Sequence, residues 1–218
     1  LLQTRRGQSL ERSCLEEARQ SMGGALLLTA TGGAHTPKSV QTFMAGCLEV
    51  GNETRVMDVY GSTEFPGVAT NGAIDPDVEL KLLEVRAPDG QLLFSPEDEP
   101  PQGEIAVRRR RPAGGSPSDA LGTATLYWQR PELNEAAWTE DGFYRMGDIG
   151  LLDYANPVEG GQPRLCIIDR VKNLEEVYWQ GDSAWIQATA LEDGVYSVLP
   201  EVQSIVLASD RNRDGVVA

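Results

Sequence analysis

The spacing of apolar residues along the chain changes close to Gly72, and this change limits the folds that the sequence can adopt. Before Gly72 the spacing predicts alternating helices and strands: a helix over 8–22, a buried strand over 25–29, a helix over 37–47 and a strand over 55–60. A strand, a helix and a second strand within about 35 residues are typical of parallel α/β folds. We therefore expect a parallel α/β layer in this part.

After Gly72 the sequence predicts short strands. Apolar and polar residues alternate over 78–82, a turn is expected at 88–90, and further strands are expected over 91–94 and 103–107. This part is expected to form a small antiparallel sheet or barrel. Four arginines at 108–111 follow the last of these strands. We expect them on a solvated edge strand, with a phosphate contact as the alternative.

The rest of the chain mixes helices and strands. Its pattern predicts a short helix over 131–138, a strand over 164–169, a helix over 187–199 and a strand over 202–208. The polar segment 170–173 connects two of these elements, and we expect a domain boundary there. Residues 1–170 would then belong to one α/β unit, and residues 171–218 would begin a smaller α+β domain.

The charge and the rare residues exclude several classes of function. The net charge is −14, from 19 Lys and Arg against 33 Asp and Glu, which argues against a nucleic-acid partner. A single histidine cannot form a His-rich metal site. Cys14, Cys47 and Cys166 lie far apart without CxxC spacing, so neither a disulfide framework nor a zinc site is indicated, and a reducing, intracellular compartment is favoured.

Four short segments carry residues suited to binding a nucleotide. In chain order they are TGGA at 31–34, YGSTE at 60–64, DGFYRMGDIG at 141–150 and IIDRVKN at 167–173. Gly32 and Gly33 follow a predicted strand, where a backbone without side chains can approach a flat ligand. Tyr60 offers an aromatic face for a base. Asp148, between two glycines, could accept both hydroxyls of a ribose.

The same segments also offer groups for phosphates and a metal ion. The hydroxyl of Thr63 suits a phosphate or carboxylate oxygen, and Glu64 suits Mg²⁺, which proteins hold through one or two carboxylates together with substrate phosphates. Arg170 offers fixed donors to a ribose or a phosphate. Each segment alone is more typical of a turn, a cap or a surface ion pair. Their order and joint chemistry favour one nucleotide site.

The segments at 60–64, 141–150 and 167–173 resemble those of the adenylate-forming (AMP-binding) superfamily. The sequence looks most like long-chain fatty acyl-CoA synthetases and the adenylation domain of carboxylic acid reductases, over about residues 10–207. The resemblance implies that 1–170 is the C-terminal part of the large AMP-binding domain and that 171–218 begins the small C-terminal domain. The family's phosphate loop and its C-terminal catalytic lysine are expected outside this sequence, so the chain is expected to be an inactive piece of a longer protein.

The resemblance also implies a role for each matching residue. Gly32, Gly33 and Ala34 would line the adenine pocket. Tyr60 would stack on the base, and Gly61 would belong to the same cofactor-binding segment. Thr63 would contact the α-phosphate or the substrate carboxylate, and Glu64 would hold Mg²⁺. Asp148 and Arg170 would bind the ribose, and Lys172 would lie at the hinge of the small domain.

The activity implied is that of an ATP-dependent, AMP-forming ligase that joins a carboxylic acid, with fatty acids as the expected class, to a thiol through an acyl-adenylate. Its cofactors would be ATP, Mg²⁺ and coenzyme A. Its partners would be small molecules, with peripheral membrane association of the complete protein left open. Two alternatives remain: loading of a carrier-protein thiol, and a degenerate, non-catalytic relative that binds nucleotides or serves as a scaffold. The scaffold is suggested by Met146 and Leu126, which stand where the family usually has Thr and Gly.

Overall fold

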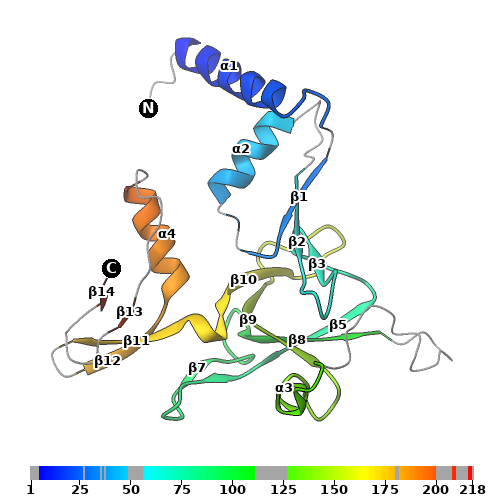
Figure 1. Ribbon diagram of the computed structural model, residues 1–218, viewed down its shortest axis with the longest axis vertical. Coiled ribbons are helices and arrows are strands. Elements are labelled where there is room, and N and C mark those ends of the chain that lie inside the picture. Colours follow the sequence, from blue (N-terminus) through cyan, green and yellow to red (C-terminus); the bar gives the residue numbers. More distant parts are fainter. Residues whose placement is uncertain are drawn as a thin grey trace.

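The computed structural model describes residues 5–26, 28–34, 36, 38–48, 56–110, 127–179, 182–199, 208–209 and 216–217. Figure 1 shows helices α1 and α2 with strand β1 at one end, a group of crossing strands in the middle, and a hairpin with α4 to one side. Parallel and antiparallel strands both occur, so the expected mixed α/β fold class is confirmed. None of the helices within the described ranges is long and apolar enough to cross a membrane.

The parallel layer is built from two helices and two strands. Its elements are α1 (Arg5–Ser21), β1 (Thr29–Gly32), α2 (Lys38–Leu48) and β2 (Val56–Tyr60). β1 pairs in parallel with β2 from Thr29 opposite Val56 to Gly32 opposite Val59. Leu15 and Ala18 of α1 pack against the buried Cys47 and Leu48 of α2. This small core holds the helices together at one end of β2.

The predicted strand over 25–29 is wrong in position. The strand begins at Thr29 because pairing with β2 begins there, and the described residues of the apolar run before it are exposed. The side chain of Leu28 is 53 % exposed, and Leu26 is also exposed. A run of apolar residues predicts a core strand, but burial depends on what packs against the run. In the described part of the chain no partner strand covers it.

A tight hairpin joins the parallel layer to the rest of the molecule. Strands β3 (Ala69–Thr70) and β4 (Ala73–Ile74) extend the first sheet in the order β1-β2-β3-β4. Asn71 and Gly72 form the two-residue turn, both at positive φ, as a turn of this length requires. A Cβ on Gly72 would lie 2.6 Å from Cγ of Arg164, and Gly72 accepts a 2.8 Å hydrogen bond from the backbone of Leu165. The turn is therefore packed against the second sheet.

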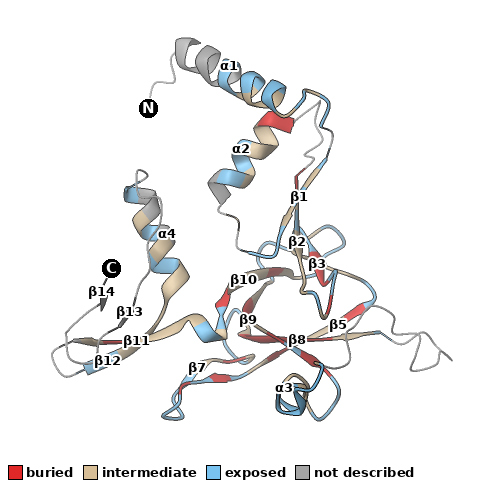
Figure 2. Cartoon of the chain, viewed as in Figure 1, coloured by how far each residue is buried: buried red, intermediate tan, exposed pale blue. Residues whose placement is uncertain are grey.

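The second sheet is antiparallel and contains most of the core. Its order is β10-β9-β8-β5, formed by β5 (Val78–Leu83), β8 (Gln102–Arg109), β9 (Tyr144–Asp153) and β10 (Arg164–Arg170). We expected a small antiparallel sheet or barrel in this part of the chain, and the structure forms the sheet. Figure 2 shows that buried positions gather where these strands cross. Ile105 and Val107 of β8 pack there with Phe65 and Val68, which follow β2.

Arg108 and Arg109 lie in β8, an inner strand of the sheet, so the predicted edge strand is wrong for these two residues. The pairing of β8 with β9 ends at Val107, however, and both arginines are paired with β5 alone. Each described arginine contacts a neighbouring segment. Arg108 pairs with Glu79, Arg109 donates to the carbonyl of Pro66, and Arg110 donates to the carbonyl of Pro76. These arginines bind loops around the sheet instead of facing solvent alone.

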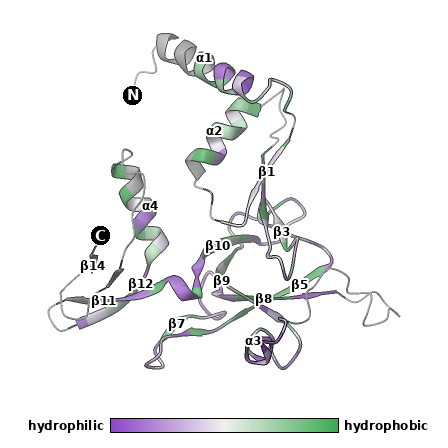
Figure 3. Ribbon diagram, in the orientation of Figure 1, coloured by the Kyte–Doolittle hydropathy of each residue, from purple (hydrophilic) through white to green (hydrophobic). Residues whose placement is uncertain are grey.

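The remaining elements are short. They are β6 (Val85–Arg86), β7 (Leu92–Phe94), α3 (Pro131–Ala136), the 3-10 turn η2 (Val171–Asn173), β11 (Leu174–Trp179), β12 (Asp182–Gln187), α4 (Ala188–Val198), β13 (Ala208–Ser209) and β14 (Val216–Val217). α3 contains no buried residue, and Figure 3 shows it as hydrophilic. The expected strand at 202–208 lies mostly outside the described residues. The boundary near 170–171 stays a prediction.

Candidate active site

The glycine-rich segment lies at the carboxyl ends of β1 and β2. Gly32 stands opposite Val59, and a Cβ on Gly32 would lie 2.5 Å from the carbonyl oxygen of Val59, so only glycine fits. Gly33 has a φ of +80° and, like Ala34, is exposed. Tyr60 is the next residue after Val59. The structure thus brings the segment 32–34 next to Tyr60, as ligand sites at strand ends require.

The segment after Tyr60 is a tight turn. The backbone of Ser62 donates to the carbonyl of Phe65, and the backbone of Phe65 donates to Oγ of Ser62, both at 3.0 Å. Gly61 is required because a Cβ there would lie 2.8 Å from the backbone nitrogen of Gly67. The turn presents Thr63 as an exposed side chain and Glu64 as a half-buried one.

The buried ring of Phe65 anchors this turn. It belongs to the core of the second sheet, and the guanidinium of Arg109 lies 4.7 Å from its centroid. Arg109 also donates to the carbonyl of Pro66. A cation over an aromatic face and a hydrogen bond to the adjacent carbonyl hold the same two residues. The arginine run, set apart from the site in the sequence, therefore supports the turn that carries Glu64.

Asp148 lies at an irregularity of β9 that directs its side chain. The pairing of β9 with β8 shifts between Glu104 and Ala106, and Gly147 at this point has a φ of +71°. Extra residues in one strand re-aim the side chains near them. On its other side β9 pairs with β10, where Asp148 stands opposite Arg170.

Asp148 accepts hydrogen bonds from two of the predicted site residues. The hydroxyl of Tyr60 donates to its Oδ2 at 2.9 Å, and Nε of Arg170 donates to its Oδ1 at 3.0 Å. Asp148 is buried, whereas half of the Arg170 side chain is exposed. Burial, followed by the charge of Asp148, raises the pKa of Tyr60 above its usual value, so the hydroxyl stays a donor.

Glu64 is held by a tyrosine that the sequence analysis did not assign to the site. The hydroxyl of Tyr127 donates to Oε1 of Glu64 at 2.7 Å and lies 3.0 Å from the hydroxyl of Tyr144. The hydrogen bond from Tyr127 is the main reason that the pKa of Glu64 lies below its usual value, and the charge of Arg170 lowers it further. Tyr144 and Asp148 both belong to β9, so the hydrogen bonds through Tyr127 bring Glu64 close to the strand that carries Asp148.

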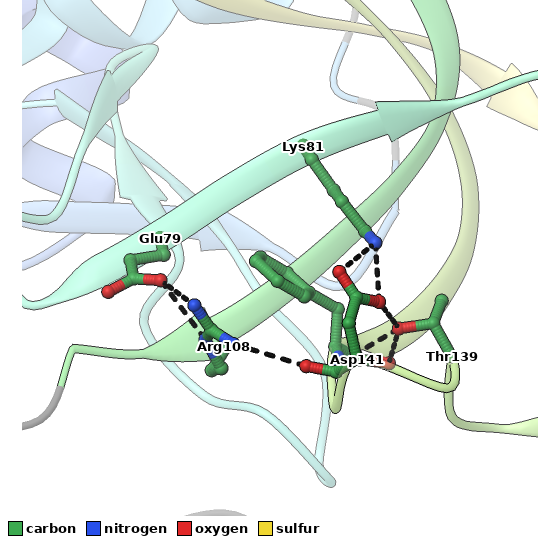
Figure 4. Close-up of polar contacts among 6 residues, drawn as sticks. Glu79, Lys81, Arg108, Thr139 and Asp141 are labelled. Carbon is green, nitrogen blue, oxygen red and sulfur yellow. Dashed lines mark hydrogen bonds and ion pairs between the residues drawn. The ribbon is translucent and has the colours of Figure 1, made fainter.

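The start of the third segment is fixed by a cluster of charged residues around Phe143, shown in Figure 4. Nζ of Lys81 and Cζ of Arg108 lie 4.5 and 4.3 Å from the centroid of the Phe143 ring. Lys81 donates to both carboxylate oxygens of Asp141 at 2.7 Å, and Arg108 donates to the Asp141 carbonyl at 3.1 Å. The cluster fixes the backbone immediately before Tyr144. Met146, two residues further, is buried in the core.

Lys172 lies in η2, directly after Arg170, with an exposed side chain. The turn is tied to α4 by Asp169, a buried carboxylate that the sequence analysis did not single out. Asp169 accepts hydrogen bonds from Asn173 at 2.9 Å and from the hydroxyl and backbone nitrogen of Thr189 at 2.9 and 3.2 Å. It therefore connects the two sides of the predicted boundary.

The predicted residues fall into three groups. Tyr60, Asp148 and Arg170 are joined by hydrogen bonds, and Glu64 is linked through Tyr127 to Tyr144 of β9. The glycines and Thr63 lie in the adjoining segments, and Lys172 follows Arg170. In the described part of the chain no three acidic, cysteine or histidine side chains gather to hold a metal. Glu64 fits Mg²⁺ as a single protein ligand that needs substrate phosphates to complete the shell.

Comparison with known proteins gives related sequences and related folds. No protein-family model matches the chain. The chain is 28 % identical over 179 residues to the long-chain-fatty-acid–CoA ligase 2 of Schizosaccharomyces pombe. The aligned region covers 76 % of this chain and 22 % of that protein. The chain therefore spans about a fifth of the length of that relative.

Two solved structures resemble the chain over nearly its whole length. The adenylation domain of a carboxylate reductase from Mycobacterium chelonae has a TM-score of 0.71 at 28 % identity, over 94 % of this chain and 28 % of that one. The adenylation domain of the carboxylic acid reductase from Segniliparus rugosus, solved with AMP and a co-purified carboxylic acid, has a TM-score of 0.70 at 25 % identity, over 98 % of this chain and 29 % of that one. The related sequences are long-chain-fatty-acid–CoA ligases and carboxylic acid reductases, and the related structures are adenylation domains, so the resemblance of the chain to the adenylate-forming (AMP-binding) superfamily is confirmed.

Proposed function

We propose that the chain is part of an ATP-dependent, AMP-forming ligase that joins a carboxylic acid to the thiol of coenzyme A through an acyl-adenylate. The observation that carries this proposal is the connection of Tyr60, Asp148 and Arg170 by hydrogen bonds, with Glu64 linked through Tyr127 to Tyr144 of the strand that carries Asp148. The predicted site residues among these come from three of the four segments that sequence analysis assigned to one nucleotide. The names of the relatives, among them fatty acid–CoA ligases, support the reaction class.

The adenosine part of the nucleotide binds at the ends of β1 and β2. The backbone at Gly32, Gly33 and Ala34 lies against the base, and the Tyr60 ring, next to Gly61, stacks on it. Asp148 accepts the two ribose hydroxyls in place of its present partners. Arg170 donates to the same sugar, because its half-exposed side chain can turn toward a ligand while staying near Asp148.

The phosphates bind beside the turn at 60–64. Mg²⁺, when bound, offsets the negative charge that increases on the phosphates as pyrophosphate leaves. Glu64 supplies the protein's carboxylate for the metal, and the Thr63 hydroxyl donates to the α-phosphate or to the incoming carboxylate. These fixed donors act where charge develops at phosphorus, which is how such a site lowers the barrier.

The second half of the reaction is attack of a thiol on the acyl-adenylate. We place the pivot between the two steps at Lys172, with 1–170 in the large domain and 171–218 at the start of the small one. η2 and α4 follow Arg170 directly, so rotation at this point would exchange the groups that face the adenylate without moving Asp148. Fatty acids are the proposed acid class.

A carrier-protein thiol is the second candidate acceptor. It is favoured by the similarity to a solved didomain of carboxylic acid reductase in which the adenylation domain is followed by a carrier domain, at a TM-score of 0.70 and 25 % identity. Coenzyme A and a carrier thiol attack the same acyl-adenylate, so both acceptors use the same nucleotide site. Supplying each thiol to the adenylated full-length protein separates them.

The proposal is tested with Glu64→Ala in the full-length gene product that contains this chain. Pyrophosphate release is measured with ATP, Mg²⁺ and a long-chain fatty acid. We expect the rate of pyrophosphate release to fall at least about 100-fold. Glu64 holds the metal, and the metal stabilises the charge that develops in the transition state by several kcal/mol. Glu84→Ala, an exposed residue paired only with Arg86, is the matched control. A wild type that binds no AMP and releases no pyrophosphate would favour the scaffold alternative.

A further inference from the structure

The backbone of Tyr127 is held in place by the side chain of Asn134. Oδ1 of Asn134 accepts a 2.5 Å hydrogen bond from the Tyr127 backbone nitrogen, and Nδ2 of Asn134 donates to the Tyr127 carbonyl at 3.1 Å. Asn134 belongs to α3, so both backbone groups of Tyr127 are bound by one residue of a helix. Trp128, the next residue, is 86 % exposed, and among the described residues no side chain is hydrogen-bonded to both of its backbone groups. The clamp at Tyr127 is therefore specific to this residue.

The Tyr127 hydroxyl is the middle member of a chain of hydrogen bonds that ends on Glu64. It lies 2.7 Å from Oε1 of Glu64 and 3.0 Å from the hydroxyl of Tyr144. A hydroxyl has one hydrogen, and an ionised carboxylate only accepts. The hydrogen of Tyr127 therefore goes to Glu64, and Tyr144 donates its own hydrogen to Tyr127.

The far end of this chain is also rigid. The ring of Tyr144 is buried and meets the Trp138 ring edge to face, with centroids 5.4 Å apart and planes at 67°. The near end is different, because Glu64 lies on a turn and is only half-buried. A glutamate in such a position has several rotamers of similar energy. Two fixed tyrosines thus orient one movable carboxylate.

We propose that Tyr127 is a positioning residue that orients the Glu64 carboxylate for Mg²⁺, an inference that rests on the proposed function of Glu64. Oε1 is fixed by Tyr127, so the carboxylate group as a whole has a fixed direction before the metal arrives. Pre-organisation of this kind tightens metal binding, because the rotamer entropy of Glu64 is lost on folding and not on binding. Tyr127 itself does not touch the metal.

The experiment compares Tyr127→Phe with the wild type in the full-length protein. Binding of Mn²⁺, as a spectroscopic substitute for Mg²⁺, is measured by electron paramagnetic resonance in the presence of α,β-methylene-ATP. We expect the affinity for Mn²⁺ to fall about 3- to 10-fold, the range that corresponds to the net contribution of one typical hydrogen bond. The Mg²⁺ concentration that gives half-maximal pyrophosphate release should rise by the same factor, while the rate at saturating Mg²⁺ stays within about twofold.

Two further variants separate positioning from a structural role. Tyr154→Phe is the matched control, because Tyr154 is 63 % exposed, and it should leave Mn²⁺ affinity unchanged. Asn134→Ala releases the Tyr127 backbone, so it should also weaken Mn²⁺ binding. If Tyr127→Phe does not fold, Asn134→Ala still tests the proposal. Added to Tyr127→Phe, it should cause little further loss, since both act through the same hydroxyl.

The outcomes are distinct. Unchanged or tighter Mn²⁺ binding in Tyr127→Phe, with Glu64→Ala inactive, would overturn the positioning role and leave the proposed function standing. Full activity of Glu64→Ala would overturn the proposed function itself. A lower melting temperature of Tyr127→Phe with an unaltered Mg²⁺ requirement would show that the tyrosine only stabilises the fold, which also contradicts the inference.

Discussion

The hydroxyl of Tyr60 donates a 2.9 Å hydrogen bond to Oδ2 of Asp148, although 88 positions separate the two residues in the chain. The bond connects the parallel layer, where Tyr60 ends β2, to the antiparallel sheet, where Asp148 lies in β9. Asp148 is also bound by Arg170 of β10. One buried carboxylate therefore joins both sheets at the place where the nucleotide is proposed to bind.

The variant Tyr60→Phe removes the hydroxyl of Tyr60 and keeps the ring, so it distinguishes the contributions of these two groups. Loss of the hydrogen bond should lower the free energy of unfolding by about 1 kcal/mol. The ring remains for stacking, so the affinity for AMP should change less than about threefold. Asp148→Ala removes the acceptor for the ribose and should weaken AMP binding at least about tenfold. Urea unfolding and calorimetry of the full-length variants measure both effects.

Equal losses of AMP affinity in Tyr60→Phe and Asp148→Ala would contradict these roles. Asp182→Ala, in an exposed position of β12, serves as the control for removal of a carboxylate from the surface. It should leave both the free energy of unfolding and the affinity for AMP close to the wild-type values.

Gly32→Ala should disturb the junction of β1 and β2. The added Cβ would lie 2.5 Å from the carbonyl oxygen of Val59, so the strands must separate at the end that faces the proposed adenine. Overpacking of this kind typically costs about 1–3 kcal/mol. Gly194→Ala in α4 is the matched change, because its Cβ meets nothing within 4 Å, and it should stabilise by up to about 1 kcal/mol. Thermal unfolding distinguishes the two, and a neutral Gly32→Ala would show that the close approach is not required.

Local sequence patterns predicted the elements that depend on local chemistry. The helices at 8–22 and 187–199 were found from the spacing of their apolar residues, and they appear as α1 and α4. The ordered segments predicted that Asp148 and Arg170 serve one ribose, and the structure brings the two side chains into contact. The Asn71–Gly72 dipeptide, a strong sign of a two-residue hairpin, was available in the sequence but was not used.

Features that depend on distant partners could not be found in this way. The apolar run at 25–28 looked like a core strand, yet Leu28 is exposed, because burial depends on what packs against it. Tyr127 was not assigned to the site, because its partner Glu64 lies 63 positions earlier in the chain. Three features of the sequence analysis lie outside the described residues: Leu126, Arg111 and most of the strand expected over 202–208. Asp169 was not singled out in the sequence, because its hydrogen-bond partner Thr189 lies 20 positions later in the chain.

The ion pair of Asp141 with Lys81 should make part of the stability depend on pH. The hydrogen bonds from Lys81 and then Thr139 lower the pKa of Asp141 to about 2. Since the folded pKa is below the unfolded value of about 4, the contribution is fully present above pH 4 and is lost as the pH falls toward 2. The difference in melting temperature between the wild type and Asp141→Asn should be constant above pH 4.5 and disappear near pH 2.

Lys81→Met is the reciprocal variant for this pH dependence. It removes the main cause of the low pKa, so it should show the same loss of stability as Asp141→Asn over the same pH range. Because both side chains are partly exposed, added salt should reduce the difference. A difference that persists unchanged at pH 2 would mean that the pair does not act through the charge of Asp141.

Asp169→Ala should loosen the connection between η2 and α4. The carboxylate accepts from Asn173 and from both the hydroxyl and the backbone nitrogen of Thr189, so its removal leaves several part-buried donors without an acceptor. Unsatisfied donors of this kind cost about 1–3 kcal/mol each, but solvent can reach some of them, and we expect a loss of about 2 kcal/mol. Hydrogen exchange should accelerate over 171–189 while β8 and β9 keep their protection. Thr189→Val removes only the hydroxyl and should produce a smaller effect over the same residues. Uniform acceleration across the central sheet would instead place Asp169 in the global core, and the two sides of the predicted boundary at 170–171 would then unfold as one unit.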